Sequence, residues 1–226
     1  MVKIEQKCPY CGSMNIAKYL YGYPLLDDEM EEKLRSGRLV LGGCCMDTAG
    51  DAENIVLLDP SHRCNDCEKD FGRPPVIVSE DRRTVEYYTD IVMSIELNIS
   101  RFPMGGRDIY IEKNDDGALV RVDRLPRQIQ SLRESEPEMF EGMAEPVDLQ
   151  ISGMKWNELL NTLYNDMHLH EWNEAYDNYD ILDGTQWSLE ISLTNERKIR
   201  YHGSNDYPPY WMQLNKIFKR YAQPDL

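Results

Sequence analysis

Two Cys-x-x-Cys pairs constrain the fold of this chain more than any other feature of its sequence. They are Cys8 with Cys11, and Cys64 with Cys67. Each pair can place two thiolates on one side of a tetrahedral ion, and two pairs complete a four-sulfur site. The sequence therefore predicts that Zn2+ is bound by these four cysteines and draws the first third of the chain together.

The separation of the two pairs by residues 12–63 is long for such a site. Closing a loop of this length costs roughly 3.5 kcal/mol, whereas structural zinc supplies about 10 to 16 kcal/mol, so the site remains favourable. Four sulfurs leave no coordination position for a substrate, and a structural role is expected. Iron is an alternative metal. Two disulfides are disfavoured in a reducing compartment.

Cys44 and Cys45 follow a pair of glycines and are too close together to bind one ion easily. We expect one of them to be a small buried apolar residue and the other to be partly exposed. The alternative is that Cys44 lies beside the metal, either replacing a ligand or acting as a reactive thiol.

The run Cys8-Pro9-Tyr10-Cys11-Gly12, with Glu68 and Phe71 after the second pair, resembles the zinc-ribbon superfamily. The resemblance covers the first third of the chain. The segment between the pairs, with Tyr21-Gly22-Tyr23-Pro24 and Leu39 to Cys44, is similar to a module of uncharacterised bacterial zinc-ribbon proteins. This resemblance implies a zinc-binding fold and no particular activity.

A short helix is predicted within that insertion. Asp27 can cap its start, Met30 and Leu34 share one face, and Gly37 can end it in the left-handed conformation. Five acidic residues crowd the beginning of the helix, where the helix dipole favours them. We interpret them as a solvated helix start, with a docking face for a basic partner as the alternative.

The pattern of apolar residues in the remainder of the chain predicts an α+β domain. Alternating apolar residues indicate a three-stranded meander, an apolar stripe indicates a helix, and two further strands precede a last helix. The segments are 91–99, 108–113, 118–123, 156–167, 187–193, 197–202 and the helix that follows Pro208-Pro209. The order βββ-α-ββ-α predicts an antiparallel sheet with two helices on one face. Residues 124–148 are predicted to form a partly ordered loop. The predicted domains are 1–75, the zinc ribbon with its insertion, and 85–226.

One loop of the second domain is a candidate binding site. It combines His202, Ser204, Asn205 and Tyr207 at a strand-to-helix junction. Functional loops have this composition, and an enzyme with its site here is one hypothesis. Local capping and turn formation is the other interpretation.

Two other groups of polar residues are candidates for metal sites. His168 and His170 are two residues apart, so on a helix they point in different directions and cannot share an ion; we expect them on the surface. Asp177, Asp180 and Asp183 could bind a hard cation, but they lack the spacing of a calcium loop.

The charge balance limits the partners. The chain has 25 Lys and Arg against 40 Asp and Glu, a formal net charge of -15, which argues against nucleic acid as a partner.

No apolar run is long enough to span a membrane, and residues 1–7 lack the apolar core of a signal peptide, so a cytoplasmic location is expected. The leading hypothesis is a non-enzymatic zinc protein that binds a protein or peptide. An acidic inhibitor or immunity-like partner of a basic protein is a further alternative. The oligomeric state is not predicted.

Overall fold

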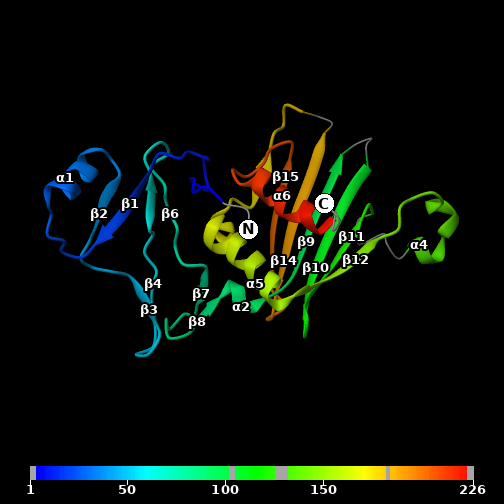
Figure 1. Cartoon of the computed structure of the whole chain (residues 1–226), viewed down its shortest axis with the longest axis horizontal. Helices are drawn as coiled ribbons and strands as arrows, with labels where there is room; N and C mark the ends of the chain where they lie inside the picture. The colour runs from blue at the N-terminus through cyan, green and yellow to red at the C-terminus, as the bar shows by residue number, and fades with distance from the viewer. Residues whose placement is uncertain (1–3, 102–104, 126–131, 182–183, 223–226) are drawn as a thin grey trace. The chain divides into compact units, whose positions relative to one another are not determined.

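The computed structural model describes residues 4–101, 105–125, 132–181 and 184–222. The protein is α+β, with many strands, few helices and open sheets (Figure 1). It divides into two compact units: Met1–Asp90 with Leu160–Trp172, and Ile91–Leu159 with Asn173–Leu226. The domain limits at 75 and 85 stay a prediction, because compactness does not test which segments fold independently.

The first unit is built from short elements. They are β1 (Ile16–Tyr21), α1 (Asp28–Arg35), β2 (Leu39–Gly43), β3 (Thr48–Gly50), β4 (Ile55–Leu57), β5 (His62–Cys64), β6 (Asp70–Phe71), β7 (Val76–Val78), β8 (Val85–Tyr87) and α2 (Tyr88–Ile91), whose last residue begins the second unit. One sheet has the order β2-β1-β5-β6, with β1 and β2 parallel. The pairs β3–β4 and β7–β8 form separate two-stranded sheets.

The short helix predicted after Asp27 is present as α1. The Asp27 carboxylate accepts a hydrogen bond from the Met30 amide at 2.8 Å, which satisfies one of the unpaired donors at the helix start. Gly37 follows the helix with a φ of 69°. The helix contributes no buried residue, so tertiary contacts of its side chains stabilise it little.

A distant segment completes the first unit. It contains a π-helical turn at Thr162–Asp166 and a 3-10 turn at Leu169–Glu171. The predicted apolar stripe is buried throughout, and its packing on the sheet stays a prediction. The α-helix α5 ends at Asn161 (Gly153–Asn161), and the residues from Leu160 onward belong to the first unit.

The second unit contains a seven-stranded sheet with the order β12-β11-β10-β9-β14-β15-β13. Its elements are β9 (Val92–Arg101), β10 (Gly105–Asn114), β11 (Gly117–Asp123), α4 (Leu132–Ser135), the 3-10 turn Pro137–Phe140, β12 (Val147–Ser152), β13 (Ala175–Asp177), β14 (Thr185–Leu193), β15 (Lys198–Ser204) and α6 (Trp211–Ala222). All pairings are antiparallel except β13 with β15.

The predicted five-stranded order lacks two of these strands. In β12, Val147, Leu149 and Ile151 alternate with polar residues, a signal that the surrounding Glu, Pro and Arg obscured. The strand begins inside the predicted loop, of which residues 126–131 lie outside the described part of the chain. The other missed strand, β13, has three residues and pairs in parallel with β15, so no local pattern indicates it.

The two faces of the large sheet differ in character. On one face the strands contribute fully buried apolar side chains, including Ile95, Leu97, Ile109 and Leu189. The helix α6 lies across this face (Figure 1), with Leu214 and Phe218 buried beneath it. The opposite face carries polar side chains at alternate positions. Among the described residues, no helix has both the length and the apolar character required to cross a membrane.

Candidate metal centre

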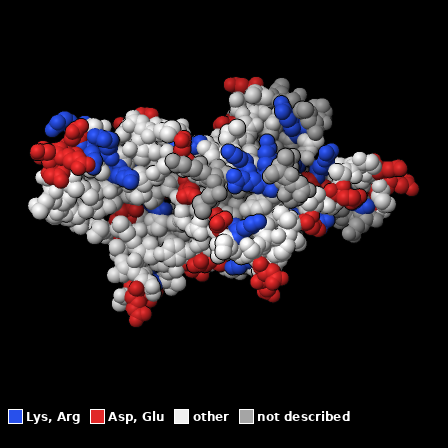
Figure 2. Space-filling model, viewed as in Figure 1, with Lys and Arg blue, Asp and Glu red and all other residues white. Residues whose placement is uncertain are grey.

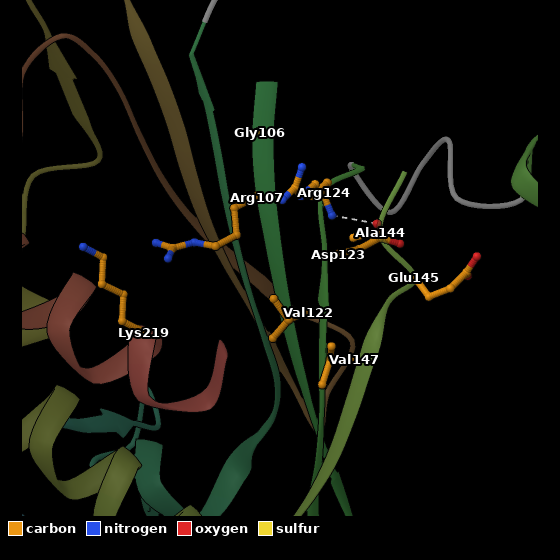
Figure 3. A pocket seen from close by; sticks show the side chains of 9 residues that line it. All are labelled: Gly106, Arg107, Val122, Asp123, Arg124, Ala144, Glu145, Val147 and Lys219. Carbon is orange, nitrogen blue, oxygen red and sulfur yellow. Dashed lines mark hydrogen bonds between the residues drawn. The ribbon is translucent and has the colours of Figure 1, made fainter. Parts of the chain in front are cut away.

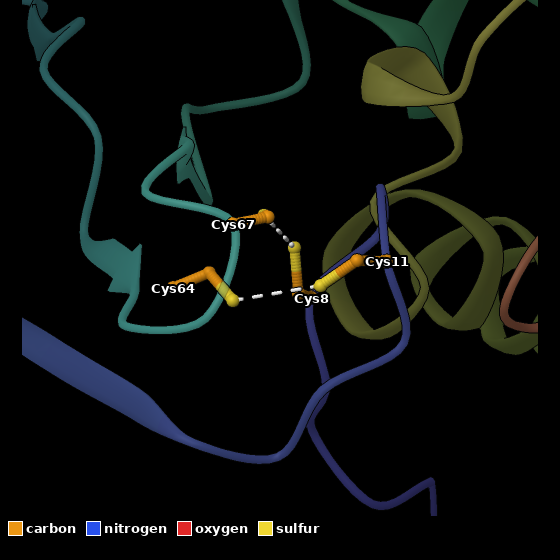
Figure 4. Close-up of side chains that lie close together, drawn as sticks. All are labelled: Cys8, Cys11, Cys64 and Cys67. Atoms are coloured by element: carbon orange, nitrogen blue, oxygen red, sulfur yellow. Dashed lines mark hydrogen bonds between the residues drawn. The ribbon is translucent and has the colours of Figure 1, made fainter.

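Four cysteine sulfurs meet in the first unit. The Sγ atoms of Cys8, Cys11, Cys64 and Cys67 all lie within 4.8 Å of one another. The first two come from the loop before β1, and the other two from the turn that joins β5 to β6 (Figure 4). The Sγ–Sγ distance is 3.6 Å both for Cys8 with Cys67 and for Cys11 with Cys64. The structure thus brings together the four residues that the spacing selects.

The two turns that carry the cysteines have the same backbone hydrogen bonds. In the first, the carbonyl of Cys8 accepts from Gly12 N and the amide of Cys8 donates to Ser13 O, both at 2.9 Å. In the second, the carbonyl of Cys64 accepts from Glu68 N at 3.0 Å and its amide donates to Lys69 O at 2.9 Å. Each turn therefore presents its two thiols by the same geometry.

The sulfur arrangement fits a tetrahedral zinc ion. Zn–S bonds of about 2.3 Å place the sulfurs of a tetrahedron roughly 3.8 Å apart, and two of the sulfur pairs are at 3.6 Å. Four sulfur donors suit zinc or iron and do not suit hard cations such as magnesium or calcium. When zinc is bound, it supplies a covalent cross-link between the two turns and no reactive position.

Burial and backbone amides act in opposite directions on these thiols. Burial raises the pKa of Cys8 to about 12 and also raises the pKa of Cys11. Burial would raise the pKa of Cys64 as well, but hydrogen bonds from the backbone amides of Cys67 and Asp66 bring it down to about 7. Without a cation the cluster therefore retains protons, and metal binding must release them.

Polar side chains join the two turns next to the cysteines. The Asp66 carboxylate accepts from Ser13 Oγ at 2.5 Å and from Asn15 Nδ2 at 2.8 Å. The backbone amide of Asn65 also donates to the Asn15 carbonyl oxygen at 2.9 Å. These residues were missed by sequence reasoning, because Ser13 and Asp66 are far apart in the chain and no motif relates them. They position the two turns for a shared ion.

Cys44 and Cys45 lie outside the sulfur cluster of the described residues. Both are exposed, so the expectation that one of them is buried is wrong. They follow β2, whose pairing with β1 ends at Gly43, and the chain there leaves the sheet with its side chains in solvent.

In the His168–Glu171 segment, His168 is buried and His170 is half-buried, whereas both were expected on the surface. His168 is 6% exposed and its ring meets Phe71 edge-on at 5.5 Å. His170 Nε2 lies 3.0 Å from the Arg73 carbonyl oxygen. The Glu171 carboxylate accepts from the amides of Gly72 at 2.8 Å and Arg73 at 3.2 Å. Tertiary contacts with the loop after β6 therefore override the helix-end position from which exposure was inferred.

Burial also controls the ionisation of this segment. It lowers the pKa of His168 to about 4, with added repulsion from His170 and His62, and lowers that of His170 to about 4. It raises the pKa of Glu171, against the effect of the hydrogen bonds from Gly72 and Arg73. The histidines are therefore neutral near pH 7 and serve as packing groups in the first unit.

The candidate loop of the second unit is engaged in local structure. Asn205 has a φ of 55°, and its Oδ1 accepts from Thr185 N at 2.8 Å. Ser204 Oγ accepts from Gln186 Nε2 at 2.7 Å, and the ring of Tyr207 stacks on Trp211 at 4.9 Å. His202 is exposed on β15. These contacts favour the capping interpretation over an active site.

The acidic loop before β14 is described only in part. Asp177 lies at the end of β13 and Asp180 is exposed in the following turn. Asp183 falls outside the described residues. Among the residues that are described, only the four cysteines group as a candidate metal site.

Comparisons with protein-family models, with curated proteins and with solved structures found no match.

Proposed function

We propose that this chain is a zinc protein of the zinc-ribbon type, in which Cys8, Cys11, Cys64 and Cys67 hold one structural ion. The observation that carries the proposal is the close approach of the four sulfurs, at distances that match a tetrahedral zinc site. The matching hydrogen bonds of the two turns support it. The cytoplasmic location remains part of this proposal.

Metal analysis tests this assignment. Protein purified without added metal should contain about one zinc per chain, and Cys64→Ser should lose it, with the unfolding transition of the first unit shifted to lower temperature. Cys44→Ser is the matched control, because Cys44 is an exposed cysteine of the same unit outside the cluster. Iron in place of zinc, or metal loss in Cys44→Ser with retention in Cys64→Ser, would contradict the assignment.

The second unit is proposed to bind a protein or peptide through the polar face of its sheet. Four neighbouring strands line a hollow of about 470 Å3 there, with Glu96, Tyr110, Glu190, Lys198 and Arg200 around it. Tyrosine and arginine are enriched at protein interfaces, and Tyr110 and Arg200 supply one of each here.

The charges of this hollow favour a basic partner. Glu190 is paired with Lys198 at 2.6 Å and with Arg200 at 2.5 Å. The hydrogen bond from Lys198, followed by that from Arg200, holds the pKa of Glu190 below the usual value. Glu96 lies directly across from Glu190 in the register of β9 and β14. Within the described ranges Glu96 has no ion-pair partner. A basic side chain of the partner would supply one.

Selection from a displayed peptide library on the full chain tests this binding. Lys- or Arg-containing peptides are expected to be enriched, and their binding should weaken about fivefold or more in Glu96→Gln. Glu138→Gln, which removes an exposed carboxylate of the same unit, should bind as the unchanged protein does. Peptides that bind both variants equally would place the interaction elsewhere and contradict the proposal.

A further inference from the structure

A second cavity opens at the end of the apolar sheet face, beside α6. Its volume is about 390 Å3, and it is lined in part by Arg107 of β10, Arg124, which follows β11, and Lys219 of α6. Figure 3 shows the Arg107 side chain extending from its strand toward the helix, with Val122 and Val147 projecting from the neighbouring strands. Three cationic side chains therefore line one hollow, together with two valines.

These three cations have no carboxylate within ion-pair distance in the described part of the chain. Arg107 is half-buried, and its guanidinium donates to the neutral Oδ1 of Asn215 at 3.3 Å. Burial lowers the pKa of Arg107. A partly desolvated guanidinium without a counter-ion is unfavourable, so an anion placed beside it would be stabilised.

The two carboxylates at the cavity both interact with Arg133, although Asp123 Oδ2 is buried without a hydrogen-bond partner in the described part of the chain. Asp123 Oδ1 accepts from the amides of Arg124 and Leu125, and it lies 3.1 Å from Arg133. Glu145 is 85% exposed and lies 3.5 Å from the same Arg133. In Figure 3 both carboxyl groups point away from the Arg107 guanidinium. The lining thus holds three cations against two carboxylates, and both carboxylates are shared with Arg133.

The charge is local and opposes the composition of the chain. The formal net charge of the whole protein is -15, yet α6 contains Lys216, Lys219 and Arg220 and no Asp or Glu. Figure 2 shows Lys and Arg side chains gathered over this helix. A basic cavity on an acidic protein attracts anions to one place on the surface.

We propose that this cavity binds a small molecule that carries a phosphate or carboxylate group and an apolar portion. The guanidinium of Arg107 offers a planar pair of donors to such an anion, and Lys219 adds a mobile positive charge. Val122 and Val147 receive the apolar portion. The volume is in the range of small-molecule sites. The proposal is independent of the zinc assignment, because the cysteines belong to the first unit.

Titration of the zinc-loaded full chain with phenyl phosphate and with benzoate tests the proposal, with benzyl alcohol as the uncharged comparison. Calorimetry should detect saturable binding of at least one anion, and the amide resonances of Gly106 and Val122 should shift. Lys219→Ala should weaken binding about fivefold or more, and Arg107→Gln should do the same. Lys216→Ala removes the same charge from the same helix away from the cavity, and it should bind normally.

The relative affinities of phenyl phosphate and benzoate identify which anionic group the cavity prefers. Equal affinity for benzyl alcohol would overturn the proposal, since the cavity would then be merely apolar. Equal weakening by Lys216→Ala and Lys219→Ala would also overturn it, because a diffuse surface field would explain the binding. Absence of saturable binding to both anions would do the same. The thermal unfolding transition of each variant, compared with that of the unchanged protein, serves as the folding control.

Discussion

Gly12 and Glu68 occupy equivalent positions in the two cysteine turns. Each donates its amide to the carbonyl of the first cysteine of its pair, and each has a left-handed backbone, with φ of 77° and 61°. Glycine adopts this conformation without strain, whereas other residues pay roughly 1 to 2 kcal/mol. The second turn therefore keeps a strain that the first avoids.

Glu68→Gly should relieve that strain. The expected gain in the free energy of unfolding is about 0.5 to 1 kcal/mol, since part of the relief is offset by the greater freedom of glycine in the unfolded chain. Gly12→Ala is the reciprocal variant and should destabilise. Urea unfolding of the zinc-loaded protein measures both. A loss of stability in Glu68→Gly would mean that the Glu68 side chain contributes more than its backbone conformation costs.

Glu171→Gln should weaken the attachment of the Leu160–Trp172 segment to the first unit. The carboxylate accepts two backbone amides and is only 6% exposed, and an amide in its place can satisfy one of them. The expected loss is about 1 to 3 kcal/mol, with faster zinc release to a chelator. Glu174→Gln changes an exposed neighbour and should alter neither quantity. Similar zinc release from both variants would contradict this account.

Acid should destabilise the first unit through His168 and His170. The pKa values of His168 and His170 are about 4 in the folded protein, against about 6.5 for an unfolded histidine. The unfolded chain therefore takes up protons first as the pH falls. The stability that neutral histidines provide is complete above about pH 6.5 and is lost progressively towards pH 4, by up to about 1.4 kcal/mol per pH unit for each histidine.

The double variant His168→Asn, His170→Gln checks this expectation. Its free energy of unfolding is measured between pH 5 and 7 and compared with that of the unchanged protein. Asparagine tolerates the left-handed backbone that His168 adopts, with a φ of 51°. The pH slope should be shallower in the double variant than in the unchanged protein. Protonation of Glu171 and of the cysteines contributes to both proteins, so the difference isolates the histidines. Identical slopes would show that the histidines do not control the acid transition.

Gly117→Ala should destabilise the second unit by about 2 kcal/mol or more. Gly117 has a φ of 136°, and an added Cβ would collide with the backbone of Ile151, on the paired strand β12, and of Gly153, directly after that strand. Gly153→Ala is the matched control, because its Cβ would meet nothing within 4 Å. Thermal unfolding distinguishes the two. An equal effect of both variants would contradict the steric argument.

Local patterns predicted much of this structure. The cysteine spacing selected the residues that cluster, and Asp27 and Gly37 predicted the limits of α1. The two predicted strands 108–113 and 118–123 pair as the β10–β11 hairpin, whose turn is Asp115-Asp116. Contacts between distant segments could not be predicted in this way. Exposure was inferred for His168 from its helix-end position, whereas Phe71, far away in the sequence, covers its ring.

The local charge distribution of the second unit could not be predicted from the sequence either. Composition describes the chain as acidic, and only the folded arrangement places Arg107, Arg124 and Lys219 around one cavity. The strand β12 had a detectable alternation of apolar residues, but β13 depends on its partner β15 for its identity as a strand. Contacts between distant segments therefore determine both the strand β13 and the cavity with its three cations.

The bonds from Gly72 to Glu171 also set an order of events during synthesis. A ribosome releases the chain from its amino end, so all four cysteines emerge well before Glu171, which lies 99 residues after Gly72. The strands β9 to β12 are translated in that interval. During synthesis, Gly72 therefore lacks its contact with Glu171, and Phe71 lacks its contact with His168, until translation has passed through most of the large sheet.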